Sequence, residues 1–274
     1  MIRTIAIANQ KGGVGKTTTA VNLSASLAAH GRRVLLIDVD PQGNATMGAG
    51  VNKNTLDTSV YTVLLGEATL LDTKVETKGG FHLIPANREL AGAEIEMVSM
   101  PERETKLKDA IHTLKAAIAA VADQYDYILI DCPPTLNLLT LNALCAADSV
   151  LIPMQCEYYA LEGLSDLVGT LRKMQQHLNP SLVIEGLLRT MYDPRISLST
   201  QVAAQLQKHF GSKLFATIIP RNVRLAEAPS HGLPVLLLDK ASKGSQAYMQ
   251  LAAELLAKHE ATATEASQAA AIPA

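Results

Sequence analysis

The feature that most constrains the fold is a glycine-rich segment near the start of the chain, residues 8–19, with the sequence ANQKGGVGKTTT. Its Gly-Lys-Thr ending (15–17) matches the end of the phosphate-loop pattern G-x-x-x-x-G-K-[ST], in which backbone N–H groups wrap a phosphate. The segment departs from the pattern twice: Gln10 stands where a glycine is usual, and a second lysine, Lys11, precedes the usual one. Because a phosphate loop follows a strand and opens a helix, we predict a strand, a loop and a helix here.

The side chains of this segment predict specific contacts with a nucleotide. Lys16 is expected to reach the β- and γ-phosphates, and the Thr17 hydroxyl is expected to ligate Mg²⁺. The alternative, a glycine-rich turn with a surface lysine, does not account for the order of strand, loop and helix. The predicted nucleotide-binding residues of the loop are Lys11, Gly12, Gly13, Val14, Gly15, Lys16, Thr17 and Thr18.

Apolar segments rich in β-branched residues alternate with segments of helical periodicity along the rest of the chain. The predicted strands cover residues 3–9, 32–40, 81–87, 125–134, 148–154, 182–192 and 214–220. The predicted helices cover about 17–30, 59–66, 103–122, 137–146, 160–177 and 198–210. Nearly continuous apolar strands separated by helices are typical of a parallel sheet covered on both faces. The fold class is therefore α/β, a three-layer P-loop NTPase fold with a mostly parallel, twisted central sheet flanked by helices.

The organisation of the chain indicates one domain and a tail. No internal repeat or linker interrupts residues 1–258, whereas 259–274 are rich in Ala, Thr and Ser, and we expect this end to be disordered. No signal peptide is visible, and no apolar run approaches the ~18 residues of a membrane span. The three cysteines lack CxxC spacing, so disulfides and zinc sites are poor candidates. These features predict a cytoplasmic protein.

Two further segments place acidic residues at the ends of predicted strands. In LLIDVDPQGNAT, Asp38 and Asp40 share one side of the strand because side chains repeat every two residues. One of these carboxylates is a candidate for Mg²⁺ and the other for orienting the attacking water, while the alternative is an ordinary capped turn. In YILIDCPP, Asp131 follows four apolar residues, the Walker B pattern of an acid that holds Mg²⁺. Cys132 has no evident base beside it, and we interpret it as a small buried side chain. The predicted magnesium ligands are Thr17, Asp38 and Asp131.

The charge of the chain is unevenly distributed. The net charge of −2 by itself argues against nucleic acid as a partner. Residues 189–243, however, contain eight basic and three acidic side chains, a net charge of +5, and the remainder of the chain has a net charge of −7. Such asymmetry indicates either a binding face or a chance cluster on a solvated surface, and composition alone leaves both open.

Five segments in order resemble the ParA/Soj branch of the ParA/MinD group of P-loop ATPases, which partitions chromosomes and plasmids. They are KGGVGKTT (the deviant Walker A motif), DVDPQGNAT, LIDCPP, LIPMQCEYYALEGL and IIPRNVRLAEAPSHG, and the resemblance covers residues 2 to about 258. It implies an ATPase that uses ATP and Mg²⁺ and forms an ATP-bound sandwich dimer. This dimer is expected to bind double-stranded DNA without sequence preference and to be released when a ParB-type centromere-binding protein stimulates hydrolysis. The implied location is the cytoplasm, on the nucleoid and without membrane attachment.

The resemblance also implies roles for individual residues. Lys11 matches the lysine that reaches the nucleotide of the other subunit, Asp40 the hydrolytic aspartate, and Asp131 the Walker B acid. Pro220 and Asn222 match a segment that lines the adenine side in relatives. The implied catalytic residues are Lys11, Lys16 and Asp40. The implied DNA-binding residues, two arginines matched to relatives and two lysines that extend their patch, are Arg195, Arg224, Lys240 and Lys243.

Other functions fit the sequence less well. A MinD-like membrane-associated cell-division ATPase, the nearest alternative, needs a basic, bulky amphipathic helix at the carboxyl end, whereas AYMQLAAELLAKHEATATEA turns small and polar. An iron–sulfur relative needs suitably placed cysteines, and a bacterial tyrosine kinase needs a tyrosine-rich tail. A non-catalytic scaffold is disfavoured because Lys16, Thr17, Asp40 and Asp131 are all present.

Overall fold

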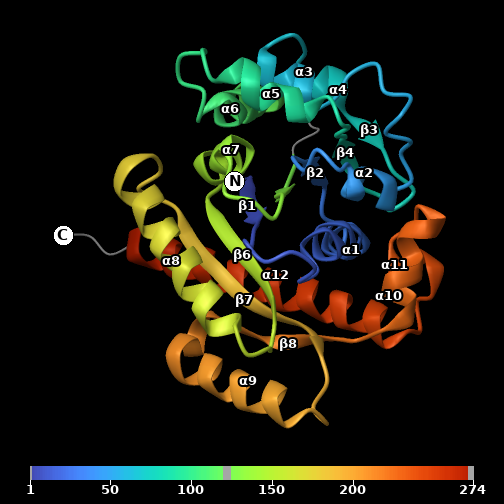
Figure 1. Ribbon diagram of the computed structural model, residues 1–274, viewed down its shortest axis with the longest axis vertical. Helices are drawn as coiled ribbons and strands as arrows, with labels where there is room; N and C mark the ends of the chain where they lie inside the picture. The colour runs from blue at the N-terminus through green and yellow to red at the C-terminus, as the bar shows by residue number, and fades with distance from the viewer. Residues whose placement is uncertain (1, 120–124, 271–274) are drawn as a thin grey trace.

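An eight-stranded sheet forms the centre of the computed structural model, which describes residues 2–119 and 125–270 (Figure 1). The strand order is β3-β4-β2-β5-β1-β6-β7-β8, and every pair is parallel except β3 with β4. The strands are β1 Arg3–Ile7, β2 Val34–Asp38, β3 Val75–Glu76, β4 His82–Ile84, β5 Tyr127–Asp131, β6 Ser149–Gln155, β7 Val183–Tyr192 and β8 Leu214–Pro220.

Helices connect the strands and cover both faces of the sheet. The first six are α1 Lys16–Ala29, α2 Asn44–Gly48, α3 Val60–Leu65, α4 Leu70–Thr73, α5 Leu90–Met97 and α6 Lys106–Ala119. The next six are α7 Leu138–Ala146, α8 Ala160–His177, α9 Ser197–Phe210, α10 Val223–Glu227, α11 Val235–Leu238 and α12 Lys243–Ala270. Two 3₁₀ helices are Gly211–Lys213 and Ala228–His231.

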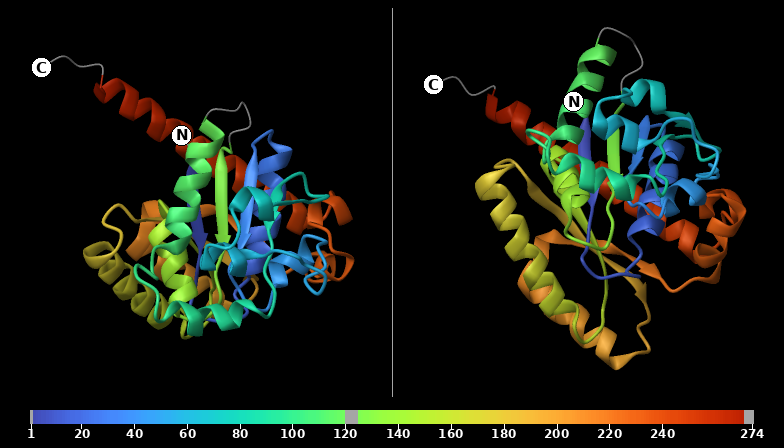
Figure 2. Two further views of the ribbon diagram at one scale, coloured as in Figure 1. Left: turned by 90° about the horizontal axis from the view of Figure 1, so that it is seen from above. Right: turned by 45° about the horizontal axis from the view of Figure 1, so that its top comes forward.

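Alternate residues of the strands build two separate cores. On β1, Ile5 and Ile7 point into the core beneath α1 and α12, whereas Ala6 points into the core beneath α6, α7, α8 and α9. Successive side chains of a strand point to opposite faces, and all three are fully buried because helices cover both faces of the sheet. Figure 2 shows the resulting layers, with helices on both sides of the central strands. The observed architecture is the three-layer α/β fold that the sequence predicts.

The predicted elements are found with shorter bounds. All seven predicted strands are present, and all six predicted helices have a counterpart, although residues 120–122 of the predicted helix 103–122 lie outside the described residues. The prediction omitted β3, α2, α4, α5, α10, α11 and α12. Five of these seven elements have no more than five residues, too few to show a hydrophobic period.

The carboxyl end differs from the predicted disordered tail. Helix α12 continues through Ala270, while residues 271–274 of the predicted tail lie outside the described residues. His259 at the predicted domain boundary is buried, and its Nδ1 lies 2.9 Å from the hydroxyl of Tyr127 on β5. Helix α12 is therefore docked on the sheet at the point where the tail was expected to begin. Alanine, which has the highest helix propensity, then allows the helix to propagate beyond it.

Candidate nucleotide-binding site

The predicted nucleotide-binding residues meet where three central strands end. Ile7 at the end of β1, just before the glycine-rich loop, pairs with Asp131 at the end of β5, which in turn pairs with Asp38 at the end of β2. The carboxyl ends of parallel strands share one edge of a sheet, where ligands bind in folds of this class. Two acidic residues and the loop, distant in sequence, are thus neighbours in space.

The glycine-rich loop (residues 10–15) leads directly into helix α1. Gly13 and Gly15 have φ angles of 75° and 88°, a left-handed backbone that residues with a Cβ rarely adopt. Gly15 is the N-cap of α1 and offers no side-chain hydrogen bond, and the first turn of the helix has no acidic residue. The first backbone N–H groups of α1 therefore have no side-chain cap, which leaves a positive helix end suited to an anion.

The two lysines of the loop lie in different surroundings. Lys16 is buried, and its Nζ donates a 3.1 Å hydrogen bond to the backbone carbonyl of Lys11. Burial lowers the pKa of Lys16, an effect opposed by the negative charges of Asp131 and Asp40. The Lys11 side chain, by contrast, is 42% exposed, and its Nζ lies 2.5 Å from the carboxylate of Glu157, just after β6. The loop thus presents one lysine inward and one at the surface.

Asp131 has the features of a carboxylate that holds a cation. It is fully buried, and in the part of the chain that the structure describes neither carboxylate oxygen accepts a hydrogen bond of regular geometry, although the Thr17 hydroxyl lies close enough to favour the charged form. Burial and the nearby Asp38 raise its pKa well above the ordinary value, opposed by the Thr17 hydroxyl and the Lys16 charge. A buried carboxylate with so little hydrogen bonding is costly, and a bound cation would stabilise its charged form.

The donor set around Asp131 suits Mg²⁺ shared with a phosphate better than a metal caged by protein. Across residues 2–119 and 125–270, no group of three or more His, Cys, Asp or Glu side chains is arranged to hold a metal ion. Mg²⁺ commonly takes one or two carboxylates and completes its coordination with water and substrate phosphates. Asp131 and Thr17, whose hydroxyl lowers the pKa of Asp131, fit that requirement.

Asp38, also a predicted metal ligand, is already engaged by hydrogen bonds. Its Oδ2 accepts bonds from the backbone and the hydroxyl of Thr46 at 2.9 and 2.7 Å, and its Oδ1 accepts one from the backbone of Asp40 at 3.1 Å. Burial raises the pKa of Asp38 to about 6 despite these bonds. The Thr46 hydroxyl also accepts the backbone N–H of Ala86 at 2.9 Å. These contacts indicate that Asp38 shapes the turn after β2, and its role as a ligand stays a prediction.

Asp40 and Cys132 complete the surroundings of the loop. Asp40 is buried to 7% exposure, and its Oδ1 accepts a 2.9 Å bond from the backbone of Gln42. Cys132 is 1% exposed, and burial together with the Asp131 charge raises the pKa of its thiol. A protonated, buried thiol agrees with the interpretation of Cys132 as a small core side chain.

A pocket of about 180 Å³ opens beside the loop. Its wall includes Gly15 and Thr18 from the phosphate-loop region and the predicted adenine-side residues Pro220 and Asn222. The Asn222 side chain also caps α10 by accepting a 3.3 Å bond from the backbone of Leu225. Two of the predicted loop residues and the predicted adenine segment, about 200 residues apart in sequence, therefore line one pocket.

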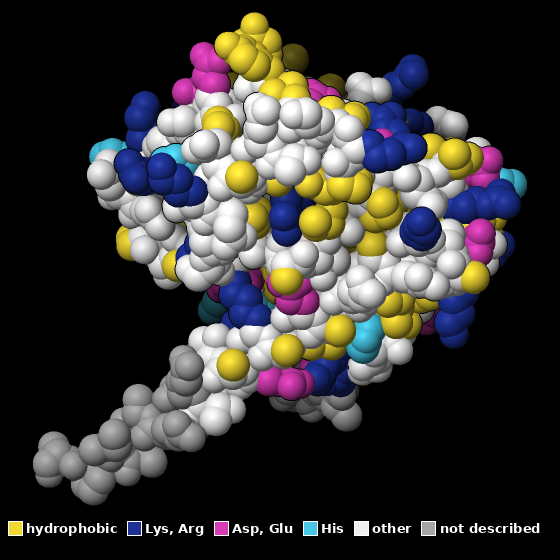
Figure 3. All heavy atoms as spheres, turned by 90° about the horizontal axis from the view of Figure 1, so that it is seen from below, with side chains coloured by type: hydrophobic (Ala, Val, Ile, Leu, Met, Phe, Trp, Pro, Cys, Tyr) yellow, Lys and Arg dark blue, Asp and Glu magenta, His cyan; other side chains and the backbone are white. Residues whose placement is uncertain are grey.

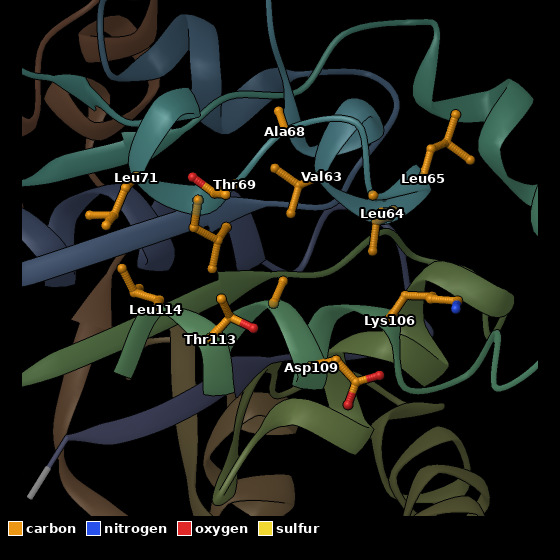
Figure 4. Close-up of a pocket in the computed structure, with 13 residues that line it drawn as sticks. Val63, Leu64, Leu65, Ala68, Thr69, Leu71, Lys106, Asp109, Thr113 and Leu114 are labelled. Atoms are coloured by element: carbon orange, nitrogen blue, oxygen red, sulfur yellow. The ribbon is translucent and has the colours of Figure 1, made fainter. Parts of the chain in front are cut away.

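A second pocket, of about 320 Å³, lies away from this chemistry. It lies between the α3–α4 segment and α6 and is lined mainly by aliphatic side chains such as Val63, Leu71 and Leu114, with Lys106 and Asp109 on α6 (Figure 4). None of the predicted nucleotide, metal or DNA residues lines it. Its apolar lining does not suit a phosphate.

The four predicted DNA-binding residues fall into two places. Arg224 on α10 pairs with Glu227 and with Asp239, which precedes Lys240. Gly244, which follows Lys243, lies so close to Leu225 that an added Cβ would be 2.7 Å from it, so α10 and the start of α12 are in contact. Arg195, after β7, is 87% exposed and pairs with Asp193 at 2.6 Å. Arg224, Lys240 and Lys243 thus form one group, and Arg195 stands on a separate loop.

On the face of the molecule drawn in Figure 3, the basic side chains do not form one continuous stripe. Figure 3 shows the molecule from below, the side that carries α9, with Lys and Arg side chains mainly toward its two sides and hydrophobic side chains between them. The pKa of the Asp193 carboxyl is lowered to about 2 mainly by its hydrogen bonds with Arg195 and to a smaller extent by the charge of Arg221, which was not among the predicted DNA-binding residues. A basic residue of the β8–α10 connection thereby lies near the loop of Arg195.

Three residues at the site were not found from the sequence. Glu157 pairs with Lys11, Thr46 holds Asp38, and the hydroxyl of Thr190 on β7 donates a 2.8 Å bond to the backbone carbonyl of Val14. Thr46 lies inside the DVDPQGNAT segment, so its hydrogen bond to Asp38 could have been predicted from that segment. Glu157 lies inside the LIPMQCEYYALEGL segment, but neither its contact nor that of Thr190 has a local sequence signal, because their partners lie in the glycine-rich loop, 146 and 176 residues away.

Comparison with known proteins matches this chain to one family model and to chromosome-partitioning proteins of several bacteria. A family model described as an AAA domain matches residues 2–184. The protein Soj of Bacillus subtilis, a sporulation initiation inhibitor, is 55% identical over 94% of this chain and 99% of its own. The chromosome partitioning protein ParA of Caulobacter vibrioides is 52% identical over 94% and 95%, and the chromosome-partitioning ATPase Soj of Thermus thermophilus is 51% identical over 94% and 96%.

A solved structure with a nucleotide shares the fold. It is described as cobyrinic acid a,c-diamide synthase from Mycobacterium smegmatis with bound ATP analogue and magnesium. It superposes with a TM-score of 0.79 at 39% sequence identity and covers 93% of this chain and 95% of that chain. Within the described residues, no helix is both long and apolar enough to cross a membrane.

Proposed function

The chain belongs to the ParA and Soj family of chromosome-partitioning ATPases, and we propose that its nucleotide state controls its attachment to DNA. In the proposed cycle, two ATP-bound chains pair as a sandwich dimer that binds double-stranded DNA without sequence preference. A ParB-type centromere-binding protein stimulates hydrolysis, and the ADP-bound chains separate and leave the DNA. Directed movement of the ParB-bound DNA follows from repeated cycles on the nucleoid.

In this proposal the phosphates of ATP bind at the start of α1. The glycine-rich loop and the uncapped helix end supply backbone N–H groups, and Lys16 supplies a charge that is already buried beside Asp131. Thr17 and Asp131 hold Mg²⁺, which contributes positive charge against the phosphate oxygens. Asp40, two residues after β2, orients the attacking water. The pocket lined by Pro220 and Asn222 takes the adenine side.

The observation that carries the proposed dimer control is the exposed position of Lys11. Its ammonium lies at the edge of the sheet where the nucleotide is proposed to bind, and its ion-pair partner, Glu157, is itself half exposed. Lys16 already occupies the inward position of the loop. Lys11 is therefore accessible to the nucleotide of a second subunit, where its charge would stabilise the triphosphate across the interface.

Exposed arginines and lysines support the proposed contact with DNA. Arg195, Lys240 and Lys243 are exposed, and Arg224 is half exposed. Their acidic neighbours, Asp193, Glu227 and Asp239, hold the two arginines at the surface. Contacts of lysine and arginine with phosphates position a protein on DNA without reading its sequence.

Sedimentation tests the proposal directly. The protein is sedimented with ATP, with ADP and with no nucleotide, each with and without non-specific duplex DNA and with anionic liposomes in place of DNA. We expect a dimer retained on DNA with ATP alone, and Lys11→Ala is expected to remain monomeric while still binding ATP. Retention on liposomes in place of DNA would favour the membrane alternative, and nucleotide-independent DNA binding would overturn the proposed control.

A further inference from the structure

The strand β7 contacts the phosphate loop through one side chain. Thr190 is 2% exposed, and its hydroxyl donates a 2.8 Å hydrogen bond to the backbone carbonyl of Val14. A Cβ added at Gly15 would lie 3.8 Å from the Cβ and the methyl group of Thr190. Thr190, Gly15 and Thr18 also line the same pocket. The side chain thus packs against the loop and makes a hydrogen bond to it.

The direction of this hydrogen bond fixes a peptide plane. In a trans peptide the C=O and the N–H of one unit point in opposite directions. Because the Val14 carbonyl points at Thr190 on β7, the N–H of Gly15 points away from β7. Gly15 has a φ of 88° and tolerates alternative orientations of this peptide more readily than a residue with a Cβ. Without the bond from Thr190, the backbone of Gly15 does not by itself hold the Val14–Gly15 peptide plane in one orientation.

The backbone of β7 is irregular at the same point. Its register with β8 shifts between Arg189 and Tyr192, and Met191 has a φ of 48°, a strained value for a residue with a side chain. The Met191 sulfur accepts a hydrogen bond from the Gln155 amide on β6. Irregularities of this kind often re-aim a side chain next to a functional site. The strand therefore departs from regular geometry where Thr190 meets the loop.

We propose that Thr190 is a positioning residue for nucleotide binding: its hydroxyl holds the Val14–Gly15 peptide so that the Gly15 N–H faces the phosphates. The inference rests on the proposed placement of ATP at the glycine-rich loop. Thr190 itself does not touch the nucleotide phosphates in this role. Its effect is to present a backbone donor in the correct orientation before the anion arrives, which reduces the ordering cost of binding.

Two substitutions separate the hydroxyl from the packing of the side chain. Thr190→Val keeps the shape and removes the donor, whereas Thr190→Ser keeps the donor and removes the methyl group. The Kd of ADP with Mg²⁺, measured by calorimetry, is expected to rise roughly tenfold in Thr190→Val, because the Val14 carbonyl loses its partner and the Gly15 donor its orientation. Thr190→Ser is expected to stay within about twofold of the parent protein. Equal binding by both variants and the parent, or equal weakening in both, would overturn the inference.

The amide signal of Gly15 gives a readout that packing alone would not move. In the parent protein, addition of ADP with Mg²⁺ is expected to shift the Gly15 amide proton downfield in a ¹⁵N–¹H spectrum, and in Thr190→Val this shift is expected to shrink. An unchanged Gly15 amide in the parent protein would overturn the inference even if Thr190→Val failed to fold. Lys16→Ala serves as the reference for the site: if this variant binds ADP as tightly as the parent, the proposed placement of the nucleotide fails, independently of Thr190.

Discussion

Lys11 and Glu157 form an ion pair within one chain: the ammonium of Lys11 lies 2.5 Å from a carboxylate oxygen of Glu157, 146 residues further along the sequence. Glu157 follows β6, and Lys11 belongs to the loop after β1, the neighbouring strand. If Lys11 contacts the nucleotide of a second subunit, it must first leave this carboxylate. The Glu157 carboxylate therefore competes with the nucleotide of the second subunit for the Lys11 ammonium.

Neutralising Glu157 is expected to favour the dimer. In Glu157→Gln the ammonium of Lys11 loses its intrachain partner, so the ATP concentration at which half of the chains are dimeric should fall. Both side chains are about half exposed, and such pairs are weak, so the expected change is no more than about fivefold. Analytical ultracentrifugation across an ATP titration measures it. Glu162→Gln removes a charge from the first turn of α8 and is the matched control; an equal shift in both variants would contradict the specific role of Glu157.

Removing the Asp40 carboxylate is expected to separate ATP binding from hydrolysis. Asp40 is buried beside the loop, and its carboxylate is the group that we propose orients the attacking water. In Asp40→Ala, phosphate release should fall by at least about a hundredfold, in the range typical of a lost proton-transfer or water-orienting group. ATP and DNA binding should persist, so that the dimer stays on DNA. Rapid turnover together with a monomeric ATP-bound state would contradict this prediction.

The sequence predicted the features of the site that depend on local pattern. The loop, α1 and the acids at the ends of β2 and β5 follow from short segments whose chemistry is recognisable without their neighbours. The contacts of Glu157 with Lys11 and of Thr190 with Val14 span 146 and 176 residues and depend on the strand order β1-β6-β7, which no local pattern encodes. The end of α12 was missed for the opposite reason: its composition suggests disorder, but docking at His259 supplies the structure from which the helix extends.

Reversing the charge of Arg195 is expected to weaken DNA binding while ATP-dependent dimerisation survives. Its side chain is 87% exposed and touches Asp193 on its own loop, so Arg195→Glu removes no buried interaction. The slope of log K against log salt should fall in magnitude by about one unit for each DNA phosphate that the variant no longer neutralises. Fluorescence anisotropy on a short duplex at several salt concentrations measures the slope. Arg172→Glu, an exposed reversal on α8, is the control; an unchanged slope in Arg195→Glu would remove this residue from the proposed DNA surface.

The attachment of α12 to the sheet predicts a dependence of stability on pH. Glu185 on β7 is 6% exposed and accepts a 2.8 Å bond from the Ser149 hydroxyl on β6. Its carboxylate lies 2.6 Å from the Lys258 ammonium and 3.2 Å from the His259 ring, both on α12. Burial alone would raise its pKa, but the nearby His259 ring and the hydrogen-bonded Lys258 ammonium outweigh burial and lower the pKa to about 2.

A depressed pKa stabilises the fold above the pKa of the unfolded chain. For Glu185 the contribution is complete above about pH 5 and is lost as the pH falls toward 2, with a size on the order of 3 kcal/mol. Glu185→Gln should therefore lower the free energy of unfolding at pH 7 and reduce its decline between pH 5 and pH 3, measured by urea unfolding with circular dichroism. Ser149→Ala removes a neutral hydrogen bond to the same carboxylate and should leave most of that decline in place. An identical pH profile for Glu185→Gln and the parent would show that other carboxylates, and not this attachment of α12, control the acid stability of the fold.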